Sequence, residues 1–350
     1  MTKQAGGERR RTTPRRPTLK DIAHAAGVSP STAARALNGE GYVAAAVRER
    51  VRATADELGY VPHVLARSLR KQVSRSVGVL VSDLRNAFYA DFAAGVGRHA
   101  RAQGYTMILG DDGGVAKEEM EAARTLVAMR VAGVVLTPVS EEVTSYLLRQ
   151  RVPVVEADRQ FAAGRCDGVV VDNTTASRRL SDHLIGLGHR RIALLIDETH
   201  WTTGGGRFRG YQEALTRAGI PADPALLVST GSDVAAARRA AVELLTRPDP
   251  PTAVFAANNV LAEGLWRAAG DLGLRIPADL SVVSFDDAPW MSMVTPGVTA
   301  VAQDALALGE AAMARLLTRI ADADAPAETV VIEADIQPRG STAAPRGELR

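Results

Sequence analysis

The sequence predicts a small all-α head followed by a larger α/β body made of two lobes with parallel sheets. Residues 18–60 carry helical patterns only, whereas apolar strand runs alternate with amphipathic helix patterns from residue 76 onward. The body also resembles itself at a constant offset of 115 residues, which predicts two similar lobes. At 350 residues and 46% hydrophobic content, the chain is long enough to bury a core in each of these parts.

Charge is unevenly distributed between head and body. Residues 1–75 contain 15 Lys and Arg against 6 Asp and Glu, whereas the rest of the chain contains 27 against 34. A basic head on an acidic body fits a polyanionic partner for the head. The alternative is a solubilising arm, because five of the arginines lie within residues 1–17, a Pro-, Thr- and Gly-rich stretch that we expect to be disordered.

The first two helices of the head are separated by a glycine. Thr18 is a suitable N-cap for a helix that precedes Gly27, and Ser29 is a suitable N-cap for a second helix with Pro30 at its first position. Gly39 ends this second helix. Two short helices joined by a glycine-containing turn predict a helix-turn-helix.

The second of these helices carries side chains that suit DNA. Ser31 and Thr32 in its first turn, and Arg35 one turn further along, can donate hydrogen bonds to base edges or phosphates. A third helical pattern over residues 45–58 ends at Gly59. The alternative is a three-helix bundle with no nucleic-acid role, and the pattern alone leaves it open.

The segments TLKDIAHAAGVSPSTAARALN (18–38) and VRERVRATADELGYVPHVLARSLR (47–70) resemble the DNA-binding head and hinge of the LacI/GalR family of transcription regulators. The resemblance implies a helix-turn-helix domain over 18–62, and a hinge helix over 63–74 whose Leu69 wedges into the minor groove from a dimer. Ala34 departs from the serine that is usual in the family. The residues implied to contact DNA are Thr18, Ser29, Pro30, Ser31, Thr32, Arg35, Asn38, Tyr42, His63, Ala66 and Leu69.

The repeat in the body predicts a cleft between the two lobes. SVGVLVSD (76–83) and RIALLIDE (191–198) are equivalent apolar strands, although two βα units can also resemble each other by chance. Ligands of parallel α/β sheets bind outside the carboxyl ends of the strands. The polar residues there, together with Arg207, suit a sugar or a similar small polar ligand. These strand-end residues are Ser82, Thr137, Asp158, Asp197, Asn258, Asn259, Asp286 and Asp287.

The family resemblance covers residues 17–342 and implies a periplasmic-binding-protein-like body. It implies that the chain crosses between lobes near residues 173, 302 and 332. The expected first lobe therefore comprises 75–172 and 302–331, the second lobe 173–301 and 332–341, and the tail 342–350. The expected effector-binding residues are Ser82, Phe88, Thr137, Asp158, Arg207, Asn258, Asp286 and Gln303.

The body departs from the family pattern at three positions. Asn259 replaces the usual aspartate and Ser284 the usual glycine, and Ser232 stands where some relatives carry an aromatic residue that stacks on a sugar ring. Trp201 or Trp290 could supply that platform instead. The last residues lack the leucine heptads that form tetramers in the family, so a homodimer is expected.

Other chemistry has little support in the sequence. The single Cys166 excludes an internal disulfide and a four-cysteine metal site, and the six histidines lack the spacing of a zinc helix. The GGGRFRG run (204–210) fails the phosphate-binding glycine pattern, and its glycines predict a loop that folds over the ligand. The GDDGG run (110–114) predicts a turn. We therefore expect no catalytic residue, no metal and no cofactor.

These observations together predict a ligand-responsive repressor that binds palindromic operator DNA as a dimer and takes a small polar effector, a sugar above all. No apolar run approaches the roughly 20 residues of a membrane span, and no apolar signal core follows the basic N-terminus. A cytoplasmic, nucleoid-associated protein without a membrane partner is expected. A solute-binding protein without a DNA role is the main alternative, and a sugar-metabolising enzyme is disfavoured because the chain lacks a phosphate loop.

Overall fold

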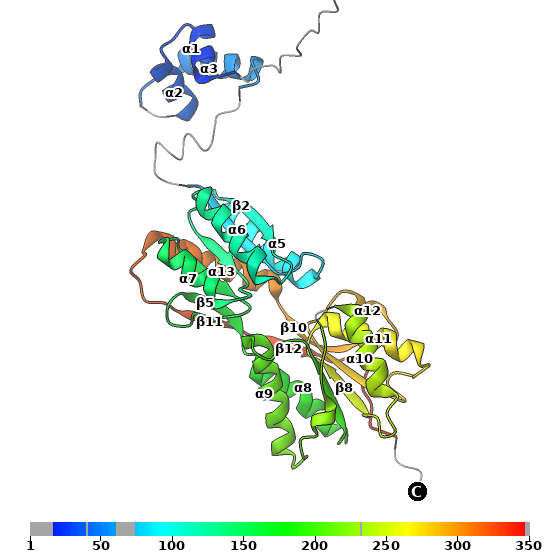
Figure 1. Ribbon diagram of the computed structural model, residues 1–350. Helices are drawn as coiled ribbons and strands as arrows, with labels where there is room; N and C mark the ends of the chain where they lie inside the picture. The colour runs from blue at the N-terminus through cyan, green and yellow to red at the C-terminus, as the bar shows by residue number, and fades with distance from the viewer. Residues whose placement is uncertain (1–16, 40, 61–73, 232, 347–350) are drawn as a thin grey trace, which may run out of the picture. The chain divides into compact units, whose positions relative to one another are not determined.

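The computed structural model describes residues 17–39, 41–60, 74–231 and 233–346. The chain divides into two units, Met1–Val73 and Ser74–Arg350 (Figure 1). None of the helices within the described residues is long and apolar enough to cross a membrane. Two expected segments lie almost wholly outside the described residues. Of the arm over residues 1–17 only residue 17 is described, and of the hinge over 63–74 only residue 74.

The N-terminal unit contains three described helices, α1 (Leu19–Ala25), α2 (Pro30–Asn38) and α3 (Ala45–Glu57). Thr18 caps α1 in a reciprocal capping box with Asp21, and the Ser29 hydroxyl caps α2 by accepting the backbone N–H of Thr32 at 3.1 Å. A small core holds the helices together. Its buried members are Ile22, Ala23, Ala26, Ala33, Ala36, Val43, Val51 and Ala55.

The C-terminal unit contains two six-stranded sheets that form separate lobes (Figure 1). The first sheet has the order β11-β5-β4-β3-β1-β2 and is parallel throughout. The second has the order β12-β10-β9-β8-β6-β7, in which only β12 is antiparallel. The strands of the first sheet are β1 (Ser76–Val81), β2 (Thr106–Asp111), β3 (Val134–Leu136), β4 (Val154–Ala157), β5 (Asp167–Val171) and β11 (Thr329–Ile332). Those of the second sheet are β6 (Ile192–Ile196), β7 (Leu227–Ser229), β8 (Ala253–Ala256), β9 (Ser281–Phe285), β10 (Thr299–Gln303) and β12 (Ala334–Gln337).

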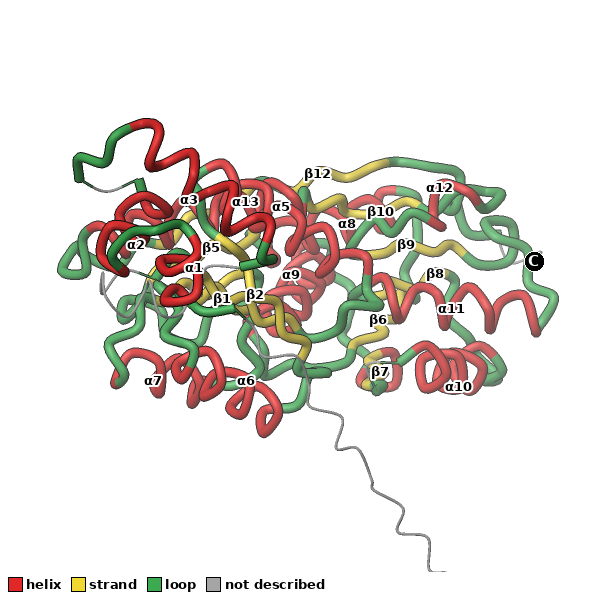
Figure 2. The backbone as a smooth tube through the Cα atoms, turned by 90° about the horizontal axis from the view of Figure 1, so that it is seen from above, coloured by secondary structure: helices red, strands yellow, loops and turns green. Residues whose placement is uncertain are grey.

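Helices cover both faces of each sheet. In the first lobe, α5 (Ala87–Ala102) and α13 (Ala305–Ala321) lie on one face, and α6 (Ala116–Ala128) and α7 (Glu141–Arg149) on the other (Figure 2). In the second lobe, α8 (Asn173–Gly186) packs on α9 (Thr202–Arg217), and α10 (Val234–Leu245) packs on α11 (Asn259–Asp271). The remaining short helices are η1 (Pro224–Leu226) and α12 (Trp290–Met293).

The internal repeat corresponds to this doubled architecture. The two sheets have equivalent strand orders, with β1 corresponding to β6 and β4 to β9. Gly95 and Gly210 are equivalent positions where another helix comes very close. A Cβ at Gly95 would lie 2.1 Å from the backbone oxygen of Leu306 on α13, and one at Gly210 would lie 2.2 Å from that of Thr174 on α8. The predicted fold class is therefore confirmed.

The chain passes between the lobes three times. It crosses between β5 and α8, returns between β10 and α13, and crosses again between β11 and β12. The boundary expected at residue 302 falls inside β10, because Gln303 still pairs with β12. The boundary expected at 332 is also early, since Ile332 still pairs with β5. These two crossings thus lie slightly beyond the expected positions, whereas the crossing between β5 and α8 lies at the expected residue 173.

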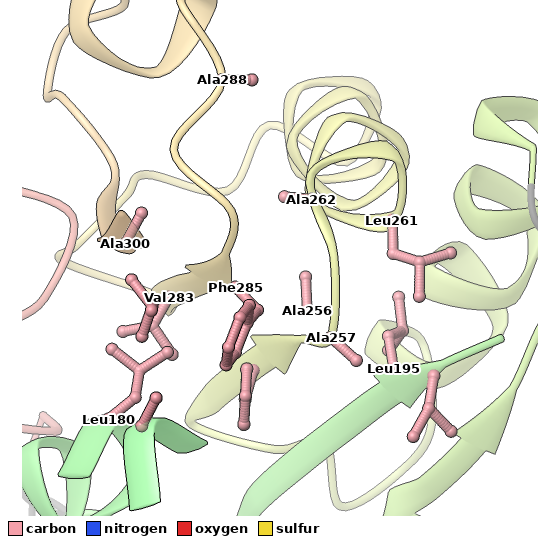
Figure 3. Packing of buried hydrophobic residues seen from close by; sticks show 14 of the residues in the cluster. Leu180, Leu195, Ala256, Ala257, Leu261, Ala262, Val283, Phe285, Ala288 and Ala300 are labelled. Atoms are coloured by element: carbon pink, nitrogen blue, oxygen red, sulfur yellow. The ribbon is translucent and has the colours of Figure 1, made fainter. Parts of the chain in front are cut away.

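Buried side chains fill the space below the carboxyl ends of the second sheet. Figure 3 shows Leu195, Ala256 and Phe285 on the neighbouring strands β6, β8 and β9, with Leu261 and Ala262 of α11 beside them. The polar residues Asp197, Asn258 and Asp286 follow directly after this apolar layer. The core therefore fixes where those polar side chains emerge.

Candidate DNA-binding surface and effector cavity

The first turn of α2 presents an exposed polar surface. Ser29, Pro30 and Ser31 are exposed, and Arg35 is exposed one turn further along. The hydroxyl of Ser29 lies 2.9 Å from those of both Ser31 and Thr32. Because Ser29 also caps the helix, its hydroxyl has a structural role in addition to the expected contact with DNA.

The other residues expected to contact DNA are spread around α2. Thr18 is half-buried at the start of α1, Asn38 is half-buried at the end of α2, and Tyr42 follows with 93% of its surface exposed. An aromatic residue so exposed has a surface available for a partner. His63, Ala66 and Leu69 lie outside the described residues, as does Ser232 of the body.

A cavity of about 210 Å³ lies between the two lobes of the C-terminal unit. We call it the interlobe cavity. It brings together seven of the eight residues expected to bind an effector, namely Ser82, Phe88, Asp158, Arg207, Asn258, Asp286 and Gln303. The other lining residues are Asp83, Arg85, Asn86, Tyr89, Gly113, Gly114, Arg159, Asp197, Trp201, Thr203, Gly204, Asp233 and Val260.

Two buried carboxylates occupy equivalent places in the two lobes. Asp158 follows β4 with a φ of 64°, and Asp286 follows β9 with a φ of 67°. This left-handed conformation is costly for a residue other than glycine, and such strain tends to occur at functional sites. Burial raises the pKa of both carboxyl groups. Arg159 and Arg207 partly offset this rise at Asp158. Arg207 and Gln303 do the same at Asp286.

Arg207 of α9 is the buried cation between these carboxylates. Its Nε donates to Oδ1 of Asn173 at 2.9 Å and its Nη1 to the backbone oxygen of Ala257 at 2.7 Å. Nη1 also lies 3.8 Å from Oδ2 of Asp286, and the guanidinium stacks 3.8 Å from the centre of the Phe285 ring. These contacts fix the orientation of the guanidinium before any ligand arrives.

Sequence reasoning missed Arg159, which is the second buried cation of the cavity and only 1% exposed. Its Nη2 donates to Ser82 Oγ at 2.6 Å and to the Tyr89 hydroxyl at 2.7 Å, and its Nε lies 3.5 Å from Oδ2 of Asp158. The Trp201 ring covers its face at 4.2 Å, and Nη1 has no hydrogen-bond partner among the described residues. An unpartnered buried N–H is costly, so this group is available to a ligand's hydroxyl.

Asn258 and Gln303 are each held by a carboxylate of the second lobe. Asn258 caps α11 through the N–H of Leu261, and its Nδ2 donates to Oδ2 of Asp197 at 2.9 Å. Gln303, at the end of β10, donates from Nε2 to Oδ1 of Asp286. These amide–carboxylate contacts hold hydrogen-bond donors and acceptors in fixed positions at the strand ends of the second lobe.

Several residues named from the sequence do not line the interlobe cavity. Thr137 is fully buried within the first lobe. Asn259 and Asp287 line a separate cavity of about 140 Å³. Of the two tryptophans considered as a platform, Trp201 lines the interlobe cavity, whereas Trp290 packs edge-to-face against Trp266 with ring centres 6.0 Å apart.

The glycine run in GGGRFRG is helical, so the loop expected from it was wrong. Gly204, Gly205 and Gly206 belong to the first turns of α9. A Cβ at Gly204 would lie 1.6 Å from the backbone oxygen of Glu198, and one at Gly206 would lie 2.9 Å from Cβ of Asn173. Close packing therefore requires these glycines, although glycine is a poor helix former.

Two further buried carboxyl groups, those of Asp112 and Glu119, interact electrostatically with Arg159. Asp112 is buried after β2, and burial raises its pKa to about 6. Glu119 on α6 is fully buried, accepts the N–H of Val139 at 2.9 Å, and has a pKa that burial raises to about 7. Among the described residues, no group of acidic, histidine or cysteine side chains is arranged to hold a metal ion.

The Glu119→Gln variant should be more stable than the native chain above pH 7, with a difference that shrinks as the pH falls. The native carboxyl binds a proton more tightly in the folded state, where its pKa is about 7, than at its ordinary value of 4.5. Folding of the native chain therefore gains stability as the pH falls through this window, and the neutral glutamine removes that gain. Thermal unfolding across the window measures it, with the exposed Glu118→Gln as control. Parallel pH profiles for the native chain and the Glu119 variant would contradict the expectation.

Comparisons with known proteins agree with both units. Residues 18–63 match a family model described as bacterial regulatory proteins, lacI family, and residues 181–342 match that of a periplasmic binding protein-like domain. The ribose operon repressor of Haemophilus influenzae is 31% identical over 317 residues, which make up 90% of this chain and 96% of that protein.

Solved structures give the same result. The Lac repressor dimer bound to operator and the anti-inducer ONPF has a TM-score of 0.84 at 27% identity, covering 94% of this chain and 100% of that one. A LacI family transcriptional regulator from Enterococcus faecium with bound ribose has a TM-score of 0.69 at 29% identity, covering 77% and 99%. The relatives are named as regulators, in line with the expectation that the chain is not an enzyme. The chain belongs to the lacI family of bacterial regulatory proteins.

Proposed function

We propose that the chain is a transcriptional repressor that binds a palindromic operator as a homodimer and responds to a small polar ligand, a sugar, in the interlobe cavity. The name of the Haemophilus influenzae relative and the ribose bound to the Enterococcus faecium regulator support a sugar. The dimer bound to operator in the Lac repressor structure supports a dimer on DNA.

The lining of the interlobe cavity carries the ligand proposal. Asp158 and Arg159 come from the first lobe, whereas Arg207, Asn258 and Asp286 come from the second. A polyhydroxylated ligand can donate to the carboxylates and accept from the guanidinium and amide groups at the same time. Such a ligand would bind both lobes and favour one angle between them, which is the differential affinity that allosteric control requires.

The size of the cavity also favours a sugar. Its volume of about 210 Å³ is below the range of roughly 300–1,000 Å³ typical of drug-sized ligands. The rings of Phe88 and Trp201 offer apolar surface for the carbon face of a sugar ring. A thermal-shift screen of monosaccharides tests this proposal, because a ligand bound only to the folded state raises the melting temperature. If no sugar raised the melting temperature, the proposed ligand class would be wrong.

The DNA side of the proposal rests on the exposed first turn of α2. Proteins of the helix-turn-helix type place these residues against base edges, and a two-fold dimer on two half-sites makes the operator palindromic. Steep loss of DNA affinity with added salt would show contacts to phosphates. Absence of binding at low salt, with and without sugar, would exclude a DNA role and leave the solute-binding alternative.

Arg35→Ala should weaken binding to the operator much more than binding to an unrelated duplex. A side chain that reads a base edge contributes about 1–3 kcal/mol of discrimination, so the ratio of the two affinities should fall roughly fivefold to 150-fold. Fluorescence anisotropy with both duplexes measures this ratio. Arg52→Ala removes the same charge from an exposed position on α3 and should weaken both duplexes by a similar factor. A uniform loss for Arg35→Ala would make Arg35 a phosphate contact instead.

A further inference from the structure

Two asparagine side chains from opposite lobes hydrogen-bond to each other. Nδ2 of Asn86 donates to Oδ1 of Asn259 at 3.3 Å, and Nδ2 of Asn259 donates to Oδ1 of Asn86 at 2.8 Å. Asn86 is the N-cap of α5 in the first lobe, and Asn259 is the first residue of α11 in the second. Each amide therefore donates to the other and accepts from it, which an ionised carboxylate cannot do because it has no donor.

The pair lies where two cavities adjoin. Asn86 lines the interlobe cavity, and Asn259 lines the cavity of about 140 Å³. Phe88, Asp286 and Gln303 line both of them. Any movement that separates the lobes at this place must break both hydrogen bonds.

Each asparagine also holds a residue that lines the interlobe cavity. Oδ1 of Asn86 accepts the backbone N–H of Phe88 at 3.1 Å. The backbone N–H of Asn259 favours the ionised form of Asp286, against the burial that raises the pKa of this carboxyl. The pair thus connects the segment that carries an aromatic wall in one lobe to a buried carboxylate in the other.

The charges around Asn259 favour a neutral side chain. Asp286 and Asp287 after β9, and Asp91 on α5, line the same small cavity. Arg207 lies beside Asp286, and Arg339 makes a two-point contact with Asp287 at 2.7 and 2.6 Å, so both arginines are already engaged. A carboxylate at position 259 would therefore face three other carboxylates.

We propose that Asn86 and Asn259 are a positioning pair, a neutral latch that holds the two lobes in the arrangement that encloses the interlobe cavity. The proposal rests on the proposed function only in that a ligand in this cavity would act on the same lobe arrangement. Asn259→Asp breaks the bond that Asn259 donates and adds repulsion. Protonation of the new carboxyl restores a donor toward Asn86 and removes the charge, so the loss reverses in acid.

Trp201 provides a reporter of lobe separation that needs neither ligand nor DNA. It belongs to the second lobe and stacks over Arg159 of the first at 4.2 Å. The chain has three tryptophans, so the double substitution Trp266→Phe and Trp290→Phe leaves Trp201 as the only one. Acrylamide quenching of Trp201 fluorescence in this background then rises when the lobes separate.

In this background, Asn259→Asp should increase quenching at about pH 8 and lose the increase toward about pH 5, because three neighbouring carboxylates raise the pKa of the new carboxyl above its ordinary value of about 3.9. Loss of one hydrogen bond shifts the ratio of separated to closed lobes by about two- to tenfold, and the added repulsion increases the shift. Asn259→Ala removes both side-chain bonds and has nothing to protonate, so its quenching should stay high at both pH values. Gln212→Glu makes the same amide-to-carboxylate change at an exposed position on α9 and should leave Trp201 unaffected.

The proposal is overturned if Asn259→Asp leaves quenching at the background value near pH 8. It is equally overturned if the Asp and Ala variants respond alike at both pH values, because the pair would then have a merely structural role. Either result leaves the proposed sugar response intact, since the measurement contains no sugar and no DNA. Conversely, if no sugar bound, the proposal that Asn86 and Asn259 hold the two lobes together would not be contradicted.

Discussion

Arg207→Ala should abolish the response to the sugar while leaving DNA binding without sugar unchanged. Arg207 is buried and holds Asn173, the backbone of Ala257 and Asp286 in one arrangement. Removing one partner of a buried, hydrogen-bonded charged group costs about 2–5 kcal/mol, so the affinity for the sugar should fall roughly thirtyfold or more. Isothermal titration calorimetry measures the sugar affinity, and fluorescence anisotropy measures the DNA affinity.

Two further variants make this expectation specific. Arg207→Lys keeps the charge but lacks the planar fork that reaches both Asn173 and Ala257, so it should also lose most of the sugar affinity. Arg209→Ala removes an exposed arginine from the same helix and should retain the response. If Arg207→Ala folded normally and still responded to the sugar, the assignment of the interlobe cavity as the effector site would be wrong.

Asp167→Ala should strongly destabilise the first lobe. Asp167 of β5 is fully buried, and its carboxylate accepts from Arg315 at 2.6 Å, Arg319 at 2.8 Å and the N–H of Glu328 at 3.0 Å. Both arginines belong to α13, so the group ties that helix to the sheet after the chain returns from the second lobe. Breaking a buried ion pair by removing one partner costs about 3–5 kcal/mol, which urea unfolding would measure.

The pH dependence of this contribution has a definite sign. Burial raises the pKa of Asp167, but the hydrogen bonds from Arg319, Glu328 and Arg315 outweigh it and hold the pKa below 3.8. The stabilisation should therefore be complete above this ordinary value and be lost as the pH falls through the lowered one. Asp271→Ala breaks the exposed pair with Arg238, which water and salt screen, and should cost much less stability than Asp167→Ala. Equal losses for both variants would contradict the structural account.

The sequence predicted the fold and most of the cavity because both depend on local patterns. Apolar strand runs must be buried, and the polar residue that follows each run must emerge at the strand end. Asp158, Asn258 and Asp286 were found in this way, and all three line the interlobe cavity. The caps at Thr18 and Ser29 were equally visible, because an N-cap needs only a side-chain oxygen before a helical pattern.

What the sequence did not reveal depends on backbone geometry and long-range packing. Adjacent residues in a strand point to opposite faces, so the pattern that places Asp158 at a strand end does not also place Arg159 in the cavity. The positive φ of Asp158 turns the chain at this point, and both side chains then reach the cavity. The glycines of α9 predicted a loop because glycine is rare inside helices. Their actual cause is the close packing of Glu198 and Asn173 against the helix, which the sequence does not show. Thr137 has the right place in the pattern, yet its strand end is buried inside the first lobe.

The most direct test of the account joins the two units in one measurement. The full chain would select an operator from random duplexes, and its affinity for that duplex would then be titrated with each sugar that raises its melting temperature. An allosteric coupling of about 1–3 kcal/mol predicts a change in DNA affinity of roughly fivefold to 150-fold for at least one sugar, and no change in the Arg207→Ala variant. An operator affinity that stays constant in the presence of a sugar shown to bind would contradict the account.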